Sequence, residues 1–262
     1  MSTIVFIHGA WLTSRSWENF LPYFEQCGYT CVAPEWPYRS GTAAELRAST
    51  APELAHVGVA ELTDHYEAIV KALPEPPILI GHSFGGLIVQ QLLDRGYGSA
   101  GVTLDSAAPK GVLAVDWDVL RSNSASLLKW MGWERVVTIT FEEFQFAFVN
   151  TFPEAQQRAL YDSYVVPETG RIFFQAAFAD LDLKQALQVN FANSARVPLL
   201  MIAGEHDHIV PAHVARANFE KYQVSPARTE FREFAGRSHL LTAQDGWEEI
   251  ASFISDWLDK RG

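Results

Sequence analysis

The 262-residue sequence has only two cysteines, Cys27 and Cys31, and it has no C-x-x-C pair or Cys/His spacing typical of zinc sites. A disulfide framework or a structural zinc is therefore not expected to hold the fold together. Gly28 stands between the two cysteines, as glycines often do where a helix ends. We expect the two cysteines to straddle a helix-to-strand turn as buried structural thiols.

Basic residues are in the minority, with 20 Lys and Arg against 31 Asp and Glu, which gives a formal net charge of -11. A nucleic-acid partner requires a basic surface, so we expect none, and anionic membrane surfaces are disfavoured for the same reason. The sequence lacks an apolar run long enough to span a bilayer and a basic N-terminal signal segment. We expect a cytoplasmic monomer or homodimer with no membrane partner.

Hydrophobic residues make up 48% of the chain, which is enough for a sizeable core. Two apolar runs, at residues 4–7 and 29–33, predict buried strands, and further strands are predicted at 78–80, 102–105, 199–203 and 229–234. Segments with helical spacing lie between them, at residues 17–26, 53–73, 86–95, 212–222 and 247–260. Alternating strands and helices predict an α/β fold, with about six mostly parallel strands flanked by helices.

The alternation stops between residues 112 and 195, where the sequence predicts helices only, at 117–131, 141–150, 153–164 and 171–189. This stretch holds 14 of the 33 aromatic residues. We therefore expect an α/β core from residues 1–111 and 196–262, interrupted by a helical lid insert, residues 112–195, that covers an apolar pocket.

One motif in the core carries chemistry. Gly81-His82-Ser83-Phe84-Gly85 follows a predicted strand and opens a predicted helix, which is the context of the nucleophile elbow G-x-S-x-G. A serine on such a sharp turn projects its hydroxyl above the sheet edge, and the flanking glycines leave room for the turn. Ser83 is the predicted nucleophile.

A serine hydroxyl needs a base, and the base needs an acid to orient it. His239 follows the strand at 229–234 and Asp207 follows the strand at 199–203, so both lie at the strand ends where open α/β sheets gather their sites. Asp105 and Glu205 are the alternative acids. We expect the remaining histidines, including His82, to be packing or surface residues.

Backbone amides must stabilise the oxyanion that forms on the attacked carbonyl. The amide of Phe84 directly follows the nucleophile, and the amide of Ala10 lies in the loop after the first strand. His8, in the same loop, is expected to brace it by hydrogen bonding. Aromatic residues are expected to line the substrate pocket, and the candidates are Trp11, Trp117, Phe146 and Phe174.

These segments resemble a known superfamily. The stretches at 7–11, 81–86, 204–207 and 236–239 look like those of α/β-hydrolases, and they are most similar to the small, cofactor-free carboxylesterase branch that includes plant methyl esterases and hydroxynitrile lyases. The resemblance implies a six-stranded sheet and no cofactor. Gly9 and Leu240 stand where some of those lyases have threonine and lysine, which argues against cyanohydrin cleavage.

The residues and the resemblance together predict a serine hydrolase that cleaves a small apolar carboxylic ester through an acyl-enzyme intermediate. A triad-dependent lyase, a perhydrolase and a small-molecule receptor that retains the triad are the alternatives. We expect no metal at the Glu205-His206-Asp207-His208 run, because neighbouring side chains at a strand end point apart.

Overall fold

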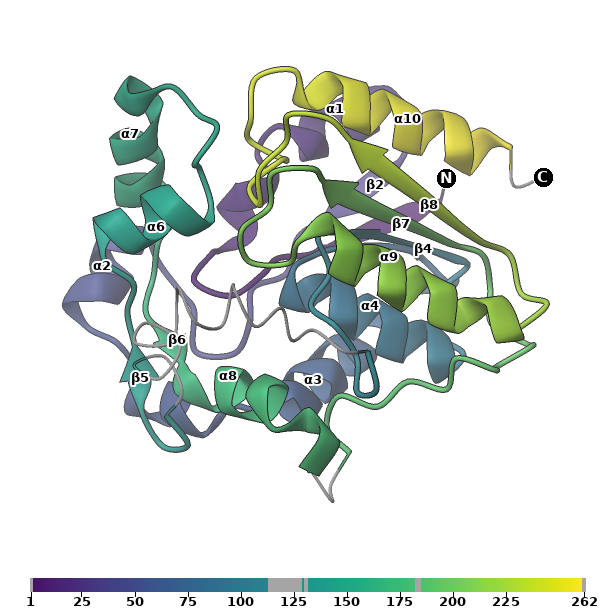
Figure 1. Cartoon of the computed structure of the whole chain (residues 1–262), viewed down its shortest axis with the longest axis horizontal. Coiled ribbons are helices and arrows are strands. Elements are labelled where there is room, and N and C mark those ends of the chain that lie inside the picture. The colour runs from purple at the N-terminus through teal and green to yellow at the C-terminus, as the bar shows by residue number, and fades with distance from the viewer. Residues whose placement is uncertain (1, 113–128, 130–131, 182–184, 261–262) are drawn as a thin grey trace.

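The computed structural model describes residues 2–260 apart from 113–128, 130–131 and 182–184. Six parallel strands form one sheet in the order β2-β1-β3-β4-β7-β8, which confirms the predicted fold class (Figure 1). The strands are β1 (Thr3–Ile7), β2 (Thr30–Val32), β3 (Ile78–His82), β4 (Ala100–Leu104), β7 (Leu199–Gly204) and β8 (Thr229–Phe234).

Helices cover both faces of this sheet (Figure 1). One face carries α1 (Phe20–Gln26) and α10 (Trp247–Asp259), and the other carries α3 (Val59–Lys71), α4 (Phe84–Asp94) and α9 (Ala212–Lys221). Every residue of β3, β4 and β7 is buried as a result. This two-sided burial explains why the central strands are continuous apolar runs in the sequence.

The side chains of β1 divide between two hydrophobic clusters. Ile4 and Phe6 pack with Phe20 and Phe24 of α1, whereas Val5 and Ile7 belong to the cluster that includes α3 and α4. Alternate residues of a strand point to opposite faces of the sheet, so a single strand supports both layers.

Two predicted helices differ most from the prediction, and the helix predicted at 117–131 lies almost entirely outside the described residues. The segment predicted as one helix at 53–73 is a short 3₁₀ helix, η2 (Pro52–His56), followed by α3. The break falls at Gly58, whose extended backbone precedes α3 and whose amide donates to Glu61 Oε2 at 3.1 Å. A carboxylate at the third helical position accepts a hydrogen bond from a backbone amide that has no partner within the helix. This contact favours the start of a separate helix after Gly58. The helix predicted at 171–189 is α8 (Gly170–Ala177), which stops at residue 177.

The segment between β4 and β7 is not purely helical. It contains α6 (Phe141–Ala147), α7 (Glu154–Tyr164) and α8, but also an antiparallel pair of two-residue strands, β5 (Val136–Val137) and β6 (Glu168–Thr169). These elements lie beyond the carboxyl ends of the sheet strands, with α2 (Ala43–Ala48) beside α7 (Figure 1). The remaining 3₁₀ helices are η1 (Ser14–Trp17), η3 (Ala179–Leu181) and η4 (Tyr222–Val224).

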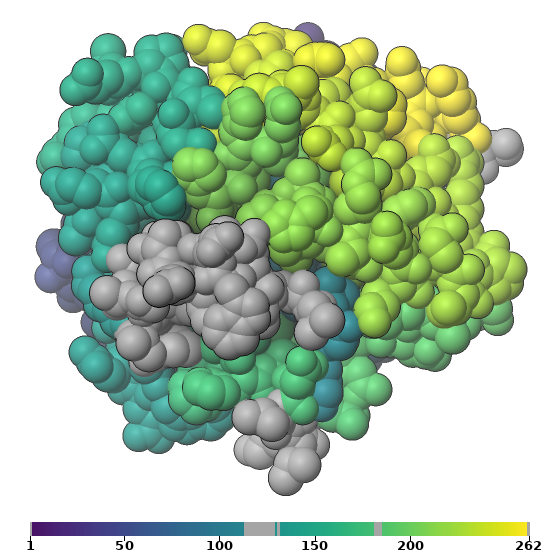
Figure 2. All heavy atoms as spheres, viewed as in Figure 1, coloured from purple at the N-terminus to yellow at the C-terminus, as the bar shows by residue number. Residues whose placement is uncertain are grey.

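The space-filling view shows the teal segment that includes α6 and α7 lying against the green and yellow C-terminal part of the chain (Figure 2). None of the helices in the part of the chain that the structure describes combines the length and the apolar character needed to cross a bilayer.

The two cysteines straddle the turn between α1 and β2, as expected, and Gly28 has a φ of 90°. The prediction that both are buried is wrong, because Cys27 is exposed and Cys31 is half-buried. Cys31 lies in β2, an edge strand with a neighbour on one side only, and Cys27 lies at the C-terminal end of α1, outside the sheet. Burial still raises the pKa of the Cys31 thiol to about 12, with Glu25 and Cys27 adding to the effect.

Candidate active site

Ser83 lies on the sharp turn that joins β3 to α4. Its φ of 55° and ψ of -122° place a non-glycine residue in a region that L-residues rarely adopt. Backbone hydrogen bonds hold this conformation: Ser83 N–H donates to Leu104 C=O at 2.9 Å, and Ala107 N–H donates to Ser83 C=O at 3.0 Å. The turn also lies at the positive end of α4, which favours negative charge beside it.

The glycines around Ser83 are required by close backbone packing. A Cβ at Gly81 would lie 2.2 Å from the carbonyl oxygen of Gly85, and a Cβ at Gly85 would lie 2.1 Å from the carbonyl oxygen of Ile7. Both distances are far inside van der Waals contact with rigid backbone. The turn therefore tolerates no side chain at either position without moving β1 or α4.

Asp207 and His239 form a buried hydrogen-bonded pair. His239 Nδ1–H donates to Asp207 Oδ2 at 2.6 Å, and both side chains are buried. The other oxygen, Oδ1, accepts the amides of Ile209 at 2.6 Å and Val210 at 2.9 Å, so the carboxylate is fixed in place. His239 Nε2 has no hydrogen-bond partner among the described residues. With Nδ1 protonated, Nε2 carries a lone pair that can accept a proton.

His82, the residue before Ser83, contacts the same histidine. Its Nε2–H donates to the backbone carbonyl of His239 at 2.8 Å, and the two imidazole rings lie 4.7 Å apart between centroids. Burial, with a contribution from the charge of His239, lowers the pKa of His82 well below 6.5. A neutral His82 thus ties the backbone of His239 to the serine turn. The sequence predicted a packing residue and gave no sign of this partner.

The two alternative acids lie elsewhere. Glu205 is exposed, and it accepts the amide of Gly236 at 2.9 Å. Asp105 is fully buried at the end of β4, where its Oδ1 accepts the amide of Gly204 at 2.7 Å. Burial, and next the charge of Asp207, raise the pKa of Asp105 well above its ordinary value. Both effects favour the neutral form of the Asp105 carboxyl beside Asp207.

His82, Asp105 and His239 each place one ligand-type atom within 4.8 Å of the others. Each histidine uses one ring nitrogen to hold the site together, His82 Nε2 on the His239 carbonyl and His239 Nδ1 on Asp207. The cluster is better described as the buried support of the Asp207–His239 pair.

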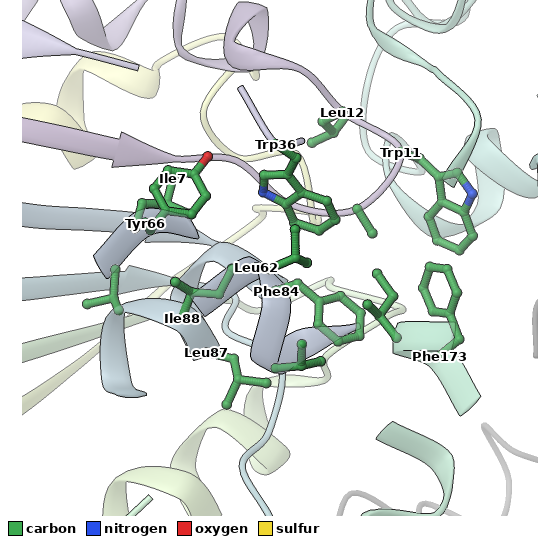
Figure 3. Packing of buried hydrophobic residues seen from close by; sticks show 14 of the residues in the cluster. Ile7, Trp11, Leu12, Trp36, Leu62, Tyr66, Phe84, Leu87, Ile88 and Phe173 are labelled. Carbon is green, nitrogen blue, oxygen red and sulfur yellow. The ribbon is translucent and has the colours of Figure 1, made fainter. Parts of the chain in front are cut away.

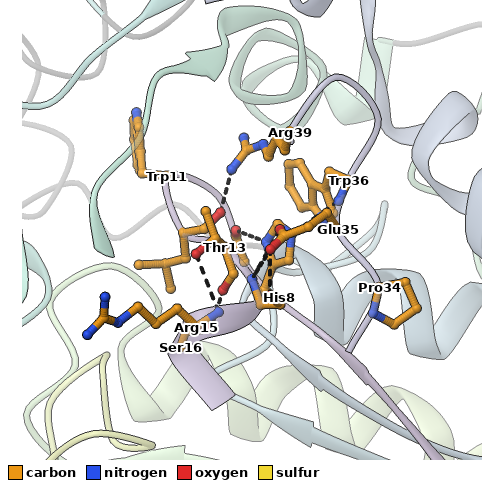
Figure 4. Close-up of polar contacts among 12 residues, drawn as sticks. His8, Trp11, Thr13, Arg15, Ser16, Pro34, Glu35, Trp36 and Arg39 are labelled. Atoms are coloured by element: carbon orange, nitrogen blue, oxygen red, sulfur yellow. Dashed lines mark hydrogen bonds and ion pairs between the residues drawn. The ribbon is translucent and has the colours of Figure 1, made fainter. Parts of the chain in front are cut away.

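The loop after β1 packs directly on the serine turn. A Cβ at Gly9 would lie 2.7 Å from the Cβ of Ser83. His8 braces this loop, since its Nδ1–H donates to the carbonyl of Gly9 at 2.9 Å while its Nε2 lies 3.2 Å from Glu35 Oε2 (Figure 4). In a planar trans peptide the C=O and N–H point in opposite directions, so fixing the Gly9 carbonyl also fixes the Ala10 amide.

Glu35 has several partners besides His8. Both its oxygens accept the amide of Ser14, at 3.0 and 3.1 Å. Burial raises the pKa of Glu35, but hydrogen bonds from His8 and Ser14 outweigh that effect and lower it overall. The brace beneath the Ala10 loop is therefore an anionic carboxylate near neutral pH.

An aromatic wall of four buried rings, those of Trp11, Phe84, Phe148 and Phe173, lies beside the serine turn and His239. Figure 3 shows Trp11, Phe84 and Phe173 together. Trp11 stacks on Phe173 at a centroid distance of 4.3 Å, and Phe84 meets the edge of Phe173 at 5.6 Å. Phe148 lies edge-on to Trp11 at 6.1 Å and contacts the imidazole of His239 at 5.0 Å. The rings link the Ala10 loop, the serine turn and the histidine through one apolar surface.

Of the four residues predicted to line a pocket, the structure places Trp11 in this wall. Phe146 is 46% exposed and packs on His208 at 4.6 Å. Phe174 is half-buried against Trp133 and Phe178. Trp117 lies outside the described residues.

Phe148 and Phe173 occupy the inner positions, and the sequence analysis missed both. Helical spacing offered a partial signal, because Phe144 and Phe148 lie four positions apart and stack at 5.2 Å.

A family model described as the alpha/beta hydrolase family matches residues 4–253. A search of curated protein sequences found no match.

Several solved structures share the fold at low sequence identity. A monoacylglycerol lipase from Paleococcus ferrophilus is 22% identical, with a TM-score of 0.72 over 99% of this chain and 95% of that one. An extracellular alpha/beta-hydrolase from a Paenibacillus species is 23% identical, with a TM-score of 0.70 over 98% of both chains. A methylesterase from Arabidopsis is 15% identical, with a TM-score of 0.70 over 99% of both chains.

Proposed function

The chain belongs to the alpha/beta hydrolase family, and we propose that within it the protein is a carboxylesterase-type serine hydrolase that cleaves a small apolar carboxylic ester. The observation that carries this proposal is the 2.6 Å hydrogen bond between Asp207 and His239, tied through His82 to the strained turn at Ser83. Nucleophile, base and orienting acid are the three parts that acyl transfer by a serine requires.

In the proposed reaction, His239 Nε2 takes the proton of the Ser83 hydroxyl while Ser83 Oγ attacks the ester carbonyl. Asp207 keeps the proton on Nδ1 and stabilises the imidazolium that forms. His239 then gives its proton to the leaving alcohol, which leaves an acyl group on Ser83. Water, deprotonated by the same histidine, attacks this acyl-enzyme and releases the acid.

Two backbone amides stabilise the tetrahedral oxyanion in this scheme, those of Ala10 and Phe84. The Phe84 amide opens α4, so it carries the favourable field of the helix N-terminus. The Ala10 amide is oriented by the His8–Gly9 hydrogen bond. Neither a metal nor a cofactor is needed for any step.

The aromatic wall supports an apolar substrate. Trp11, Phe84, Phe148 and Phe173 offer large buried rings beside the reacting groups, and such a surface favours an apolar acyl or alcohol group over a polyanion. The similar structures include a lipase and a methylesterase by name, which fits ester cleavage.

Labelling with a fluorophosphonate, followed by a panel of p-nitrophenyl esters graded in acyl size, tests the proposal. We expect covalent labelling of Ser83 and steady turnover of short esters, with both lost in Ser83→Ala. Binding without steady turnover would instead identify a receptor, and aldehyde release from a cyanohydrin or peracid formation would identify lyase or perhydrolase chemistry. A folded Ser83→Ala variant with full esterase activity would refute the nucleophile.

A further inference from the structure

A buried ion pair connects the segment between β4 and β7 to the loop that carries Ala10. Glu168, in β6, pairs with Arg39 Nη2, and the two side chains are 0% and 1% exposed. The same carboxylate accepts two backbone amides, that of Trp11 at 3.1 Å and that of Thr169 at 2.7 Å. Trp11 directly follows Ala10 in the chain.

Arg39 is itself fixed on several sides. One guanidinium nitrogen donates to the carbonyl of Leu12, and the guanidinium lies 4.8 Å from the centre of the Trp36 ring (Figure 4). A buried carboxylate without such a partner would be strongly disfavoured. Arg39 therefore supplies the partner that a buried carboxylate needs and holds Glu168 in place beside the Trp11 amide.

Trp11 has an unusual backbone conformation. Its φ is 58°, in the left-handed region that a bulky residue adopts only when the surroundings enforce it. Both sides of the residue are held by the segment before α8: Trp11 N–H by Glu168, and Trp11 C=O by the amide of Val166 at 2.9 Å. The Trp11 ring also stacks on Phe173 of α8.

Resting on the proposed function, we infer that Glu168 is a positioning residue for the oxyanion hole, acting through the Ala10–Trp11 peptide. Rotation of that peptide would relieve the positive φ of Trp11, but it would turn the Ala10 carbonyl oxygen toward the carboxylate. Repulsion between these oxygens disfavours the rotated state. Glu168 thus selects the loop conformation in which the Ala10 amide and the Trp11 ring keep their places.

The neighbouring peptide is held independently. His8 fixes the Gly9–Ala10 peptide from the core side, through Glu35. Glu168 fixes the Ala10–Trp11 peptide from the segment between β4 and β7. The two peptides that flank the Ala10 Cα are therefore held from opposite sides, one by the core and one by the segment between β4 and β7.

Glu168→Gln tests the inference, because it preserves shape while removing the charge. The readouts are kcat and KM on a short p-nitrophenyl ester and inhibition by a trifluoromethyl ketone, which forms a tetrahedral adduct with a reactive serine. We expect kcat to fall on the order of 10- to 100-fold with KM nearly unchanged, and ketone affinity to fall in proportion to kcat/KM.

Arg47→Met is the matched control. Arg47 also ties this segment to the core, donating to the carbonyls of Val165 at 2.6 Å and Asp162 at 2.8 Å, whereas the Trp11 backbone is held by Glu168 and Val166. We expect its kcat and ketone inhibition to match those of the wild type. Should Glu168→Gln not fold, Glu168→Asp keeps the charge but withdraws the carboxylate from the Trp11 amide, and the same loss of kcat is expected.

A folded Glu168→Gln or Glu168→Asp variant with wild-type kcat and ketone inhibition would overturn the inference. So would an equal loss in Arg47→Met, which would show a general effect of loosening the segment. Failure of the wild type itself to label at Ser83 or to turn over any ester would refute the proposed function instead, so the two failures are distinguishable.

Discussion

The ring of Phe148 stands edge-on to the imidazole of His239, with the centroids 5.0 Å apart and the planes at 79°. The backbone of Phe148 joins the contact, since its carbonyl accepts the amide of Leu240 at 3.0 Å. The histidine is thus enclosed partly by the core and partly by the segment between β4 and β7. Substitutions in that segment should therefore change activity as well as stability.

Phe148→Ala should lower kcat/KM for short esters and destabilise the protein by about 3–5 kcal/mol, because it opens a cavity beside His239. The larger space should also improve the relative rate on bulkier acyl groups. Ester panels and urea unfolding measure the two effects.

Phe146→Ala is the control for this substitution, since Phe146 is exposed and packs on His208. Its effect on stability should stay within about 0.5–1 kcal/mol, and its substrate preference should match the wild type. Equal effects of the two substitutions would contradict the assignment of Phe148 to the inner wall.

Asp207→Asn should lower kcat by a factor of about 10⁴, because an amide cannot hold the proton on His239 Nδ1 or stabilise the imidazolium. Asp105→Asn should lower kcat much less, within about tenfold, because the amide oxygen of asparagine can also accept the Gly204 amide. Steady-state kinetics on the two purified variants check this. A larger loss in Asp105→Asn would indicate that Asp105 is the orienting acid.

Gly85→Ala should abolish activity and destabilise the fold by several kcal/mol, since its Cβ would lie 2.1 Å from the backbone of β1. Gly28→Ala is the matched case, because Gly28 has a φ of 90° but nothing within 4 Å of its Cβ position. Backbone strain alone should lower the free energy of unfolding of Gly28→Ala by about 1 kcal/mol and leave its kcat unchanged. Thermal unfolding and ester turnover distinguish the two outcomes.

His82 predicts a dependence of stability on pH. Its folded pKa lies well below 6.5, so below that pH the unfolded chain binds a proton that the folded chain refuses. The free energy of unfolding should fall by up to about 1.4 kcal/mol per pH unit on acidification. Asp105 acts in the opposite sense. Its pKa is raised in the folded chain, so above pH 4 the folded chain binds a proton more readily than the unfolded chain does, and this residue adds stability as the pH falls toward 4.

Comparison of His82→Gln with the wild type separates these effects. When the two curves of unfolding free energy against pH are subtracted, the contribution of Asp105, common to both proteins, disappears and the contribution of His82 is left. The difference should narrow as the pH falls from 7 to 5, because only the wild type loses stability through this residue. Parallel curves would show that His82 titrates normally in the folded state.

Local sequence patterns were sufficient to predict the strands of the sheet and the turn at Ser83. The central strands β1, β3, β4 and β7 are largely apolar runs, and the glycines of the G-x-S-x-G motif are required by close backbone packing within and beside the turn. The positions of Asp207 and His239 followed from a topological rule, because residues after parallel strands meet at one sheet edge.

Long-range partners were not predictable in this way. Glu168 lies 129 positions from Arg39 and 157 from Trp11, and neither glutamate nor arginine has a local pattern that predicts burial. The choice between Phe146 and Phe148, or between Phe173 and Phe174, depends on how each helix rotates against the core. Tertiary packing sets that rotation, so the sequence could indicate an aromatic helix but not its inner face.

The sheet order also constrains how the chain folds during synthesis. β1 to β4 and the hydrogen bonds that hold Ser83 all lie before residue 108, whereas β7 pairs with β4 only after residues 105–198 have been made. Until then the fully buried strand β4 is an open, apolar edge, which is the kind of edge that pairs with other chains. The greatest risk of aggregation for the nascent protein therefore lies at what becomes the centre of the finished sheet, and we expect chains truncated before β7 to precipitate.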